Sequence, residues 1–375
     1  MKASTTVLGI MSGTSIDSVD YALCAIGERD LELRRHWQAA FPPTLQRRLH
    51  EAARGAAGSH EVGQLHHDLG RFYARQAGQF AAAENPELVG LHGQTIFHNP
   101  NARALATFQL GEPAYLAEAL RVPVVSNFRA ADIAAGGQGA PLATIFHERV
   151  FARKGEHVCV NNLGGISNVT SIDWTRGVAP QLVAFDTGPA NVLLDLAMRS
   201  LTGGKRQSDW NGAWAARGRP SDALLSEWLR HPYFRRKPPK STGRELFGEP
   251  FWHKALPQMR RAGLSKFDML ATLTEFTARS ITLNYRLHLP SMPRTIILTG
   301  GGAANDALVA SIRAALGPLG KIRLVSSAVL GWPTQSIEPA AFALLAWLRA
   351  SSRPGNLPQT TGASRAVRLG QISEE

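Results

Sequence analysis

Near the start of the chain, a short run of glycine, hydroxyl and acidic residues has the composition of a phosphate-binding loop. The run Gly13–Asp17 lies between two apolar segments, which predicts two strands joined by a tight turn. Successive backbone N–H groups at such a turn form a concavity for anions, and glycine permits close approach. Asp17 and Asp20 add the oxygen ligands that a hydrated Mg²⁺ prefers. Taken alone, the segment fits a polyphosphate site or a polar hairpin, and it lacks the Gly-Lys-Ser/Thr of a P-loop.

A second acidic residue stands where another apolar run ends. Val183–Phe185 predicts a buried strand, Asp186 follows it, and a helix is predicted over 191–201. Thr187 and Gly188 would then lie at the start of that helix, where N–H groups and the positive end of the dipole favour anions. We interpret Asp186 as a candidate base; the alternative is that it caps the helix.

Two further glycine turns follow buried strands in the second half of the chain. Gly164 and Gly165 separate two apolar runs, which again predicts strand, turn and strand. The run Gly300–Gly302 follows a strand predicted over 295–299 and precedes a helix predicted over 306–316. Glycines at such a position let a flat ligand or a phosphate lie against the backbone. Three loops of this kind in one chain carry more weight than any one of them.

Polar residues also follow two buried runs in the first half. Gln94 comes after a strand predicted over 88–91, at the carboxyl end where ligands gather in open α/β sheets. Arg129 and Asp132 follow a strand predicted over 122–125 and precede a glycine-rich passage. We expect this passage to be a loop or hinge that places Arg129 and Asp132 in a cleft; an ordinary interdomain linker is the alternative.

The composition is typical of a soluble globular protein. The 375 residues suffice for two domains, and 44% of them are hydrophobic and 19% charged. Cys24 and Cys159 lie in apolar runs, which fits a reducing cytoplasm and argues against a disulfide framework or a zinc site. No apolar run is long enough to cross a bilayer, and the first residues lack the apolar core of a signal peptide. We therefore expect a cytoplasmic protein with no membrane partner.

The net charge of +12 permits nucleic acid binding, but the arginines are scattered and only 7% of the residues are aromatic. The densest basic patch is Arg235-Arg236-Lys237, with Lys240 and Arg244 beyond it. Two consecutive prolines make this patch a loop. We interpret it as a solvated surface or a grip on an anionic small molecule, and we expect no nucleic acid partner.

Several segments form a joint pattern over nearly the whole chain. They are Gly9–Asp20, Gly93–Thr95, Gly136–Leu142, Asn162–Ile166, Phe185–Pro189, Pro238–Glu245, Gly300–Gly302, Gly355–Pro358 and Thr361–Ala363. Together they closely resemble the anhydro-N-acetylmuramic acid kinase family, within the acetate and sugar kinase/Hsp70/actin superfamily. The resemblance implies a bacterial enzyme of cell-wall recycling. Such an enzyme opens the anhydro bridge of its sugar with water and phosphorylates O6 with ATP.

The resemblance also implies roles for residues around the sugar. Asp186 matches the family's base, which takes a proton from the water that attacks C1. Glu338 matches a family acid near the sugar, where it would orient the water; alternatively it caps the last helix. Gln94, Arg129 and Asp132 are the expected sugar contacts, and we infer that Arg129 pairs with the lactyl carboxylate.

The nucleotide and its metal are assigned in the same way. The first loop and the Asp186 loop would grip the phosphates, and the Gly300–Gly302 loop would hold the adenosine. The expected contacts are glycine, hydroxyl and acidic residues of these loops: Gly13, Thr14, Ser15, Asp17, Asp20, Gly164, Gly165, Thr187, Gly188, Gly300, Gly301 and Gly302. Asp17 and Asp20 would also hold Mg²⁺, by their side chains or through water.

The implied fold is α/β, with two RNase H-like (actin/hexokinase-like) domains whose mixed sheets flank a nucleotide cleft. We expect 1–126 plus 340–375 to form domain I, with the first phosphate loop, and 127–339 to form domain II. A last helix over 339–349 is expected to return to domain I. The sequence does not determine the oligomeric state, and a homodimer stays open.

Two other functions and two departures from the family pattern remain. The chain fits a sugar kinase of the same fold that phosphorylates a free hydroxyl, or a non-enzymatic regulator switched by nucleotide.

Asn127 stands where the family usually has Asp, and Ala190 where it usually has a second Gly. The first change removes a charge that can contact sugar or metal, and the second is expected to be a tolerated packing change.

Overall fold

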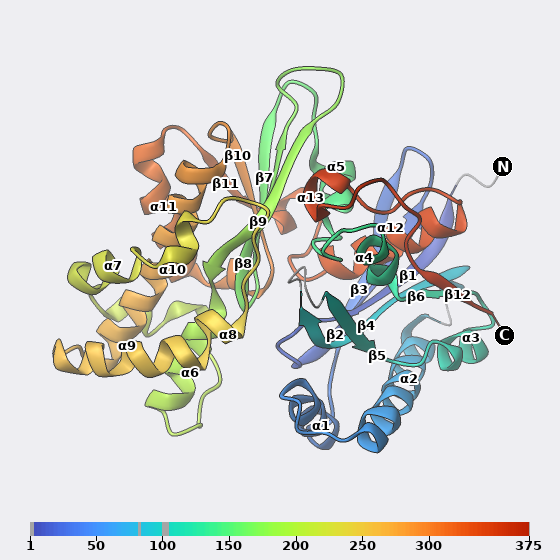
Figure 1. Ribbon diagram of the computed structural model, residues 1–375, viewed down its shortest axis with the longest axis horizontal. Helices are drawn as coiled ribbons and strands as arrows, with labels where there is room; N and C mark the ends of the chain where they lie inside the picture. The colour runs from blue at the N-terminus through green and yellow to red at the C-terminus, as the bar shows by residue number, and fades with distance from the viewer. Residues whose placement is uncertain (1–3, 82–83, 100–104, 375) are drawn as a thin grey trace. The chain divides into compact units, whose positions relative to one another are not determined.

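The computed structural model describes residues 4–81, 84–99 and 105–374. The chain divides into two compact units (Figure 1): unit 1 comprises Met1–Val150 and Gly331–Glu375, and unit 2 comprises Phe151–Leu330. The first division lies later in the chain than the boundary after residue 126 expected from the sequence. The segment between the two positions belongs with unit 1 because it bonds to the tail: Thr144 Oγ1 lies 3.2 Å from Thr360 Oγ1.

Unit 1 is built on a mixed sheet with the strand order β12-β6-β4-β1-β2-β3, and β5 pairs with β4. The strands are β1 (Thr5–Ser12), β2 (Ser18–Ile26), β3 (Leu31–Ala40), β4 (Leu88–Asn99), β5 (Ala106–Leu110), β6 (Val124–Ser126) and β12 (Gln371–Ser373). β1 is antiparallel to β2 and parallel to β4. The expected end of the strand at Leu91 is wrong: β4 continues to Asn99 because its second half pairs with β5.

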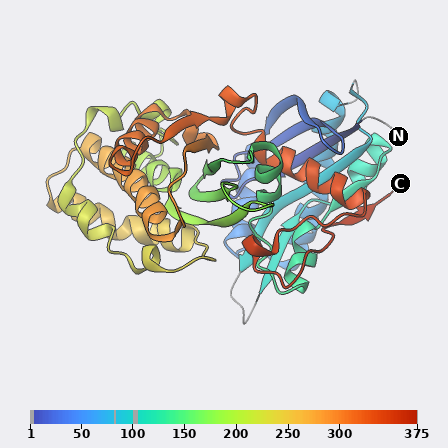
Figure 2. The same cartoon turned by 90° about the horizontal axis from the view of Figure 1, so that it is seen from above.

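The helices of unit 1 are α1 (Pro43–Ala53), α2 (Ser59–Ala81), α3 (Ala114–Leu120), α4 (Phe128–Ala134), α5 (Thr144–Phe151), α12 (Ile337–Ala350) and α13 (Pro358–Thr361). α12 lies against β1, β2 and β4, as Figure 2 shows from above. The helix approaches so closely that a Cβ on Gly9 would lie 1.8 Å from the Pro339 carbonyl oxygen. The expected return of the last helix to the first domain is therefore confirmed.

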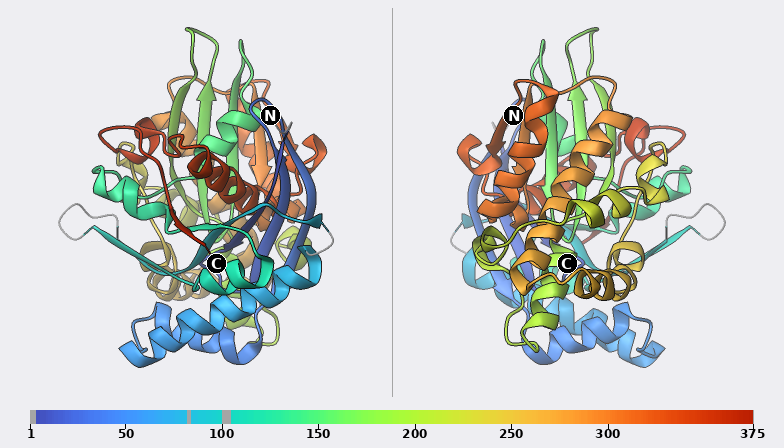
Figure 3. Two further views of the ribbon diagram at one scale, coloured as in Figure 1. Left: turned by 90° about the vertical axis from the view of Figure 1, so that its right-hand side faces the viewer. Right: turned by 90° about the vertical axis from the view of Figure 1, so that its left-hand side faces the viewer.

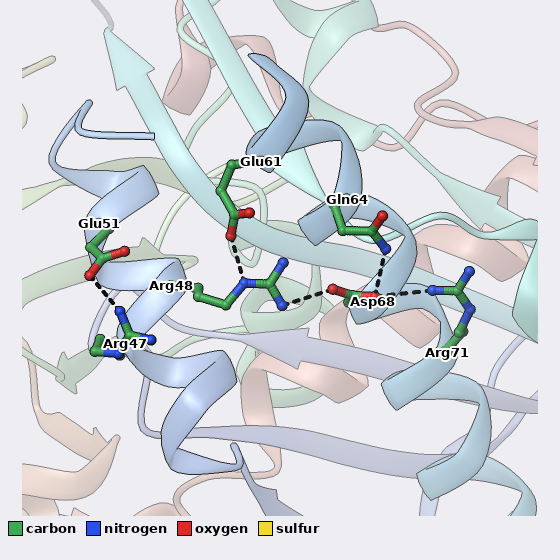
Figure 4. Close-up of polar contacts among 7 residues, drawn as sticks. All are labelled: Arg47, Arg48, Glu51, Glu61, Gln64, Asp68 and Arg71. Carbon is green, nitrogen blue, oxygen red and sulfur yellow. Dashed lines mark hydrogen bonds and ion pairs between the residues drawn. The ribbon is translucent and has the colours of Figure 1, made fainter. Parts of the chain in front are cut away.

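A half-buried charged network joins α1 to α2 (Figure 4). Arg48 of α1 donates through Nη1 to Asp68 at 2.8 Å and through Nε to Glu61, both on α2. Arg71 donates to the other oxygen of Asp68 at 3.0 Å. Beneath these charges, apolar side chains such as Leu49 and Leu69 are fully buried. The helix pair is thus held mainly by its apolar faces, since solvent weakens ion pairs that it can still reach.

Unit 2 repeats the strand arrangement of unit 1. Its sheet has the order β11-β10-β7-β8-β9, with β7 (His157–Leu163), β8 (Ile166–Asp173), β9 (Gln181–Pro189), β10 (Thr295–Thr299) and β11 (Arg323–Ser326). β7, β8 and β9 form an antiparallel meander, and β10 and β11 add in parallel. In both units the first three strands form a meander and the following strands add beside the first. The expectation of two RNase H-like α/β domains with mixed sheets is confirmed.

Some helices of unit 2 pack on this sheet, and others pack on those helices. The helices are α6 (Asn191–Leu201), α7 (Asp222–Trp228), α8 (Arg244–Phe247), α9 (Glu249–Arg261), α10 (Lys266–His288) and α11 (Asp306–Leu316), with short 3₁₀ turns that include η4 (Pro232–Arg235) and η5 (Gly301–Ala304). The predicted bounds of α6 and α11 are confirmed. α10 begins with a capping box formed by Ser265 and Asp268 and runs beside α11 (Figure 3). Among the described residues, no helix has the length and apolar character needed to span a bilayer.

Candidate active site

The loop between β1 and β2 is held from inside, so that its polar side chains point outward. Ile16 is 2% exposed, although its φ of 60° is unfavourable for a β-branched residue. The Ile16 N–H group donates to the Gly13 carbonyl at 3.2 Å, and its own carbonyl accepts from Gln46 at 2.8 Å. Thr14, Ser15 and Asp17 are exposed. Backbone strain of this kind is found at ligand loops, where the surrounding structure maintains it.

Gln94 supports the same loop from β4. Its side chain is fully buried, and Nε2 donates to the carbonyl oxygens of Gly13 and Thr95, both at 3.1 Å. Among the described residues, the Gln94 side-chain oxygen Oε1 has no hydrogen-bond partner. A buried polar atom without a partner is costly and is often completed by a ligand or water. Gln94 therefore contacts the loop directly and keeps one acceptor available.

Unit 1 brings together three charged residues predicted for the site. Asp20 of β2 accepts a hydrogen bond from Gln38 at 2.7 Å. Glu338 lies in the first turn of α12, and burial raises its pKa to about 7, an effect that the nearby Asp20 charge increases and the Arg129 charge opposes. The Ser336 N-cap of α12 makes no side-chain cap bond. The close packing of α12 on β1 thus places an acid of the C-terminal segment beside the first loop.

Arg129 lies on helix α4, which ends at Ala134, and the glycine-rich passage that follows is a loop, as expected. The Arg129 guanidinium contacts His92 Nε2 at 2.9 Å and donates to the Gly139 carbonyl at 2.7 Å. Burial lowers the Arg129 pKa to about 10, although the charges of Glu338 and Asp132 oppose this. Because His92 Nε2 accepts from the guanidinium, its proton is on Nδ1, which lies 2.8 Å from the Gly93 carbonyl. His92 was missed by the sequence reasoning; its place directly before Gly93 and Gln94 was the available signal.

Asp132 has a different environment from Arg129, although both lie on α4. Its carboxylate is fully buried and accepts from the Gly139 N–H group at 2.8 Å, from Asn356 at 2.7 Å and from Thr361 at 2.7 Å. These donors come from the glycine-rich passage and from the C-terminal tail. Asp132 therefore ties two loops to α4, and its contact with the sugar stays a prediction.

Asp186 lies in β9 and is fixed at both its main chain and its side chain. The Thr242 N–H group donates to Asp186 Oδ2 at 2.8 Å, and Tyr233 Oη donates to the Asp186 carbonyl at 2.7 Å. Burial raises the Asp186 pKa to about 7; the Thr242 N–H group and the Lys240 charge oppose this, while Glu245 adds to it. Helix α6 begins at Asn191 after an Ala190 N-cap without a side-chain bond. Asp186 is therefore not the cap of α6.

The start of α6 is covered by the turn between β7 and β8. The N–H groups of Asn191 and Val192 donate to the carbonyls of Gly164 and Gly165 at 3.0 and 3.1 Å. Thr187 is fully buried, and its hydroxyl donates to Ser167 Oγ at 2.7 Å. Thr187 and Gly188 thus lie in β9 and not, as the sequence predicted, at the start of α6, and the first N–H groups of α6 have partners within the chain.

The Gly300–Gly302 loop packs against the same turn. Gly300 has a φ of +75°, and a Cβ there would lie 2.2 Å from Asn162 Oδ1. A Cβ on Gly302 would lie 2.8 Å from the Leu163 Cβ, whereas Gly301 is exposed. The glycines at 300 and 302 permit this contact between two backbones. Unit 2 therefore groups the turn at Gly164, the start of α6 and the Gly300–Gly302 loop.

Lys240 differs from the solvated basic patch to which the sequence assigned it. Arg235, Arg236 and Lys237 are exposed, but Lys240 is 7% exposed. Its ammonium donates to Asn284 Oδ1 at 2.6 Å. A lysine that follows two prolines and precedes Ser-Thr-Gly offered no sequence signal for burial.

Comparison with known proteins identifies the family. A profile of the family described as "Anhydro-N-acetylmuramic acid kinase" matches residues 5–375. The chain belongs to the anhydro-N-acetylmuramic acid kinase family. Curated proteins of that name from Picosynechococcus sp. and Acaryochloris marina are 41% and 42% identical to it, each over 98% of this chain, and the alignments cover 98% and 99% of those proteins.

The (R)-2-hydroxyglutaryl-CoA dehydratase component A of Acidaminococcus fermentans aligns with a TM-score of 0.48 and 14% identity, over 92% of this chain and 99% of that one.

The two departures from the pattern of the anhydro-N-acetylmuramic acid kinase family have simple structural settings. Asn127 is exposed, has a φ of 53° and donates to Gln371 at 3.3 Å. Asparagine tolerates this left-handed backbone well. Ala190 is fully buried with a φ of −126°, and its N–H group donates to the Gly165 carbonyl at 3.0 Å. Since its φ is negative, a methyl group is accommodated there without the strain of the left-handed region.

Proposed function

We propose that the chain is an ATP-dependent kinase that opens 1,6-anhydro-N-acetylmuramic acid with water and phosphorylates O6. The product is N-acetylmuramic acid 6-phosphate, and the reaction belongs to peptidoglycan recycling. The observation that carries the proposal is the Asp186 carboxyl, which is oriented by the Thr242 N–H group and has its pKa raised to about 7. A general base is most effective when its pKa lies near the working pH.

In this reaction Asp186 accepts a proton from the water that attacks C1. The bond between C1 and O6 breaks, and O6 attacks the γ-phosphorus of ATP while ADP departs. The water oxygen remains on C1, and its proton is on the Asp186 carboxylate. Fixed placement of the carboxylate contributes most of its effect, since the reacting groups must meet in one geometry.

The first loop is assigned the phosphates of ATP. Exposed hydroxyls of Thr14 and Ser15 and the exposed Asp17 carboxylate supply oxygen atoms, which is the donor chemistry that Mg²⁺ prefers. Among the described residues, no group of three or more His, Cys, Asp or Glu side chains could hold a metal by itself. Asp17 and Asp20 would therefore hold Mg²⁺ together with phosphate and water oxygens. When bound, Mg²⁺ neutralises charge on the transferring phosphoryl group.

The remaining assignments follow the chemistry of each group. Arg129 is suited to a bidentate contact with the lactyl carboxylate, because His92 and the Gly139 carbonyl already fix its plane. Glu338 is assigned to orient the attacking water. The adenosine is assigned to the Gly300–Gly302 loop, with the phosphates also approaching Gly164, Gly165 and the 187–188 segment. Both free cysteines are buried, and we place the reaction in the cytoplasm.

Isotope labelling tests the reaction class. The purified protein is incubated with the anhydro sugar, ATP and Mg²⁺ in ¹⁸O-labelled water, and the phosphorylated product is analysed by mass spectrometry before its anomeric oxygen exchanges. We expect one ¹⁸O atom at C1 and none in the transferred phosphoryl group. Product without label at C1 would exclude hydrolytic opening and favour a kinase for free hydroxyl groups. Absence of any product, with nucleotide still bound, would favour a regulator.

A further inference from the structure

A buried lysine lies next to the Asp186 segment, and no step of the proposed reaction uses it. Lys240 Nζ donates to Asn284 Oδ1 at 2.6 Å and to the carbonyls of Phe234 and Tyr233 at 3.3 and 3.4 Å. The ammonium also lies 4.8 Å from the centre of the Tyr233 ring. Removing an ammonium from water is unfavourable unless its protons find partners, and here carbonyl and amide oxygens supply them.

The backbone connects Lys240 to Asp186 on two sides. The Asp186 N–H group donates to the Lys240 carbonyl at 3.2 Å. Two residues further on, the Thr242 N–H group donates to the Asp186 carboxylate at 2.8 Å. The segment 240–242 thus holds both the main chain and the side chain of Asp186. Whatever fixes this segment also fixes the carboxylate.

Asn284 of α10 extends the connection to the other side of Asp186. While its Oδ1 accepts from Lys240, its Nδ2 donates to the Thr187 carbonyl at 2.8 Å and to the Ser280 carbonyl at 2.7 Å. The amide is fully buried. One side chain on a long helix therefore links the lysine to the residue that follows Asp186.

We propose that Lys240 is a positioning residue for Asp186: its buried ammonium, held by Asn284, fixes the segment whose N–H group orients the carboxylate. The positive charge also favours the ionised form of the carboxylate. This inference rests on the proposed function, in which Asp186 is the base.

The charges around Asp186 have opposing effects. Burial raises its pKa to about 7, and the Glu245 carboxylate of α8 adds to this effect. The Thr242 N–H group and the Lys240 ammonium act against it. Tyr233 of η4 donates its hydroxyl to the Asp186 main-chain carbonyl, and burial is the main cause that raises the pKa of this phenol. Loss of the Lys240 charge should therefore raise the Asp186 pKa further.

The ammonium itself is also influenced from several elements. Burial lowers the Lys240 pKa to about 8. The Asp186 charge acts against this shift, whereas the Arg236 charge lowers the pKa further. His288 of α10 lies near enough that the Lys240 charge contributes to lowering the pKa of His288, after burial as the larger cause. Lys240 is thus protonated at neutral pH, and its charge is lost only on the alkaline side.

Two substitutions separate the charge from the hydrogen bond. Lys240→Gln removes the charge but keeps a donor for Asn284, whereas Lys240→Met removes both. Lys254→Gln, an exposed lysine on α9, is the matched control. We expect the acid limb of the pH profile of kcat/KM to move up by about one unit in Lys240→Gln, which is about tenfold in rate below the limb. The KM for ATP and the control profile should not change. An unmoved acid limb in a folded Lys240→Gln protein would overturn the proposal.

A double-variant cycle shows whether Lys240 acts through Asp186. In the Asp186→Asn background, Lys240→Gln should cause no further loss, because the carboxylate that it positions is gone. An equal loss in both backgrounds would mean a merely structural role and would overturn the inference. Full turnover of the single Asp186→Asn variant would instead reject the base assignment itself. The two failures are therefore distinguishable, and thermal unfolding of each variant identifies any protein that does not fold.

Discussion

The first loop of unit 1 and the Asp186 segment of unit 2 are supported in opposite ways. In the first loop, the backbone is tied from inside by Ile16 and Gln94, and the polar side chains Thr14 and Ser15 remain exposed. In unit 2, the Asp186 side chain itself receives a hydrogen bond and is partly buried. Phosphates need accessible donors and oxygens, whereas a base needs a fixed direction and a shifted pKa. In the Asp186 segment, burial raises the pKa of the carboxyl to about 7, and the charges of Glu245 and Lys240 act on it in opposite directions.

The largest test removes the base. Asp186→Asn keeps the shape of the side chain but cannot accept the proton from water. We expect kcat to fall by about 10²–10⁴-fold, the usual contribution of a general base. Calorimetric titration should show nucleotide affinity close to that of the unchanged protein, because the first loop is intact. A normal kcat of Asp186→Asn would show that the Asp186 segment does not supply the base.

A second test uses the pH dependence of stability. The pKa values of Asp186 and Glu338 are raised to about 7 by burial, so the folded state holds both protons more tightly than the unfolded chain does. The stability gained from these protons is fully present below about pH 4 and is lost as the pH rises through about 7. The free energy of unfolding of the double variant Asp186→Asn/Glu338→Gln, measured relative to the parent protein, should therefore be higher at pH 8 than at pH 4. We expect a difference on the order of 1–3 kcal/mol.

Thermal unfolding of variant and parent at both pH values measures this effect. Thr14→Ala is the control, because it removes an exposed side chain of the first loop that does not titrate in this range. Its effect on stability should be the same at pH 4 and pH 8. If the double variant also changed the free energy of unfolding by the same amount at pH 4 and pH 8, the raised pKa values of Asp186 and Glu338 would be contradicted.

A third test addresses the support of the first loop. Gln94→Leu keeps the buried volume but removes the hydrogen bond to the Gly13 carbonyl. A lost hydrogen bond of this type is worth about 1–1.5 kcal/mol, so kcat/KM for ATP should fall by roughly tenfold. Steady-state kinetics measure the change, with Gln64→Leu on the exposed face of α2 as control. Equal kinetics of the two variants would show that the hydrogen bond from Gln94 does not support the first loop.

The smallest effect is expected at the network between α1 and α2. Arg48→Ala removes partly buried ion pairs with Glu61 and Asp68, which solvent still reaches. We expect the free energy of unfolding to fall by about 0.5–1 kcal/mol, since solvent weakens such pairs. Urea denaturation measures the loss, and turnover should stay unchanged. A loss of unfolding free energy as large as that expected for a fully buried side chain would contradict the weak contribution assigned to these ion pairs.

Much of the framework could be predicted from local patterns. The bounds of α6 and α11 were predicted correctly because apolar periodicity and helix-start signals lie within each segment. The glycine loops were found because apolar runs lead directly into them. The strand after Leu88 was cut short, since its second half depends on pairing with β5, which lies beyond a chain reversal.

The sequence by itself therefore determined the family, the two related sheets and the loops that are candidates for ligand binding. Only the tertiary structure placed Glu338 beside Asp20, gave Asp132 its internal partners and buried Lys240 against Asn284. The physical reason is separation along the chain. Backbone conformation and periodicity are encoded by neighbours, whereas the hydrogen bonds and burial that set a pKa come from segments that meet only when the chain is folded.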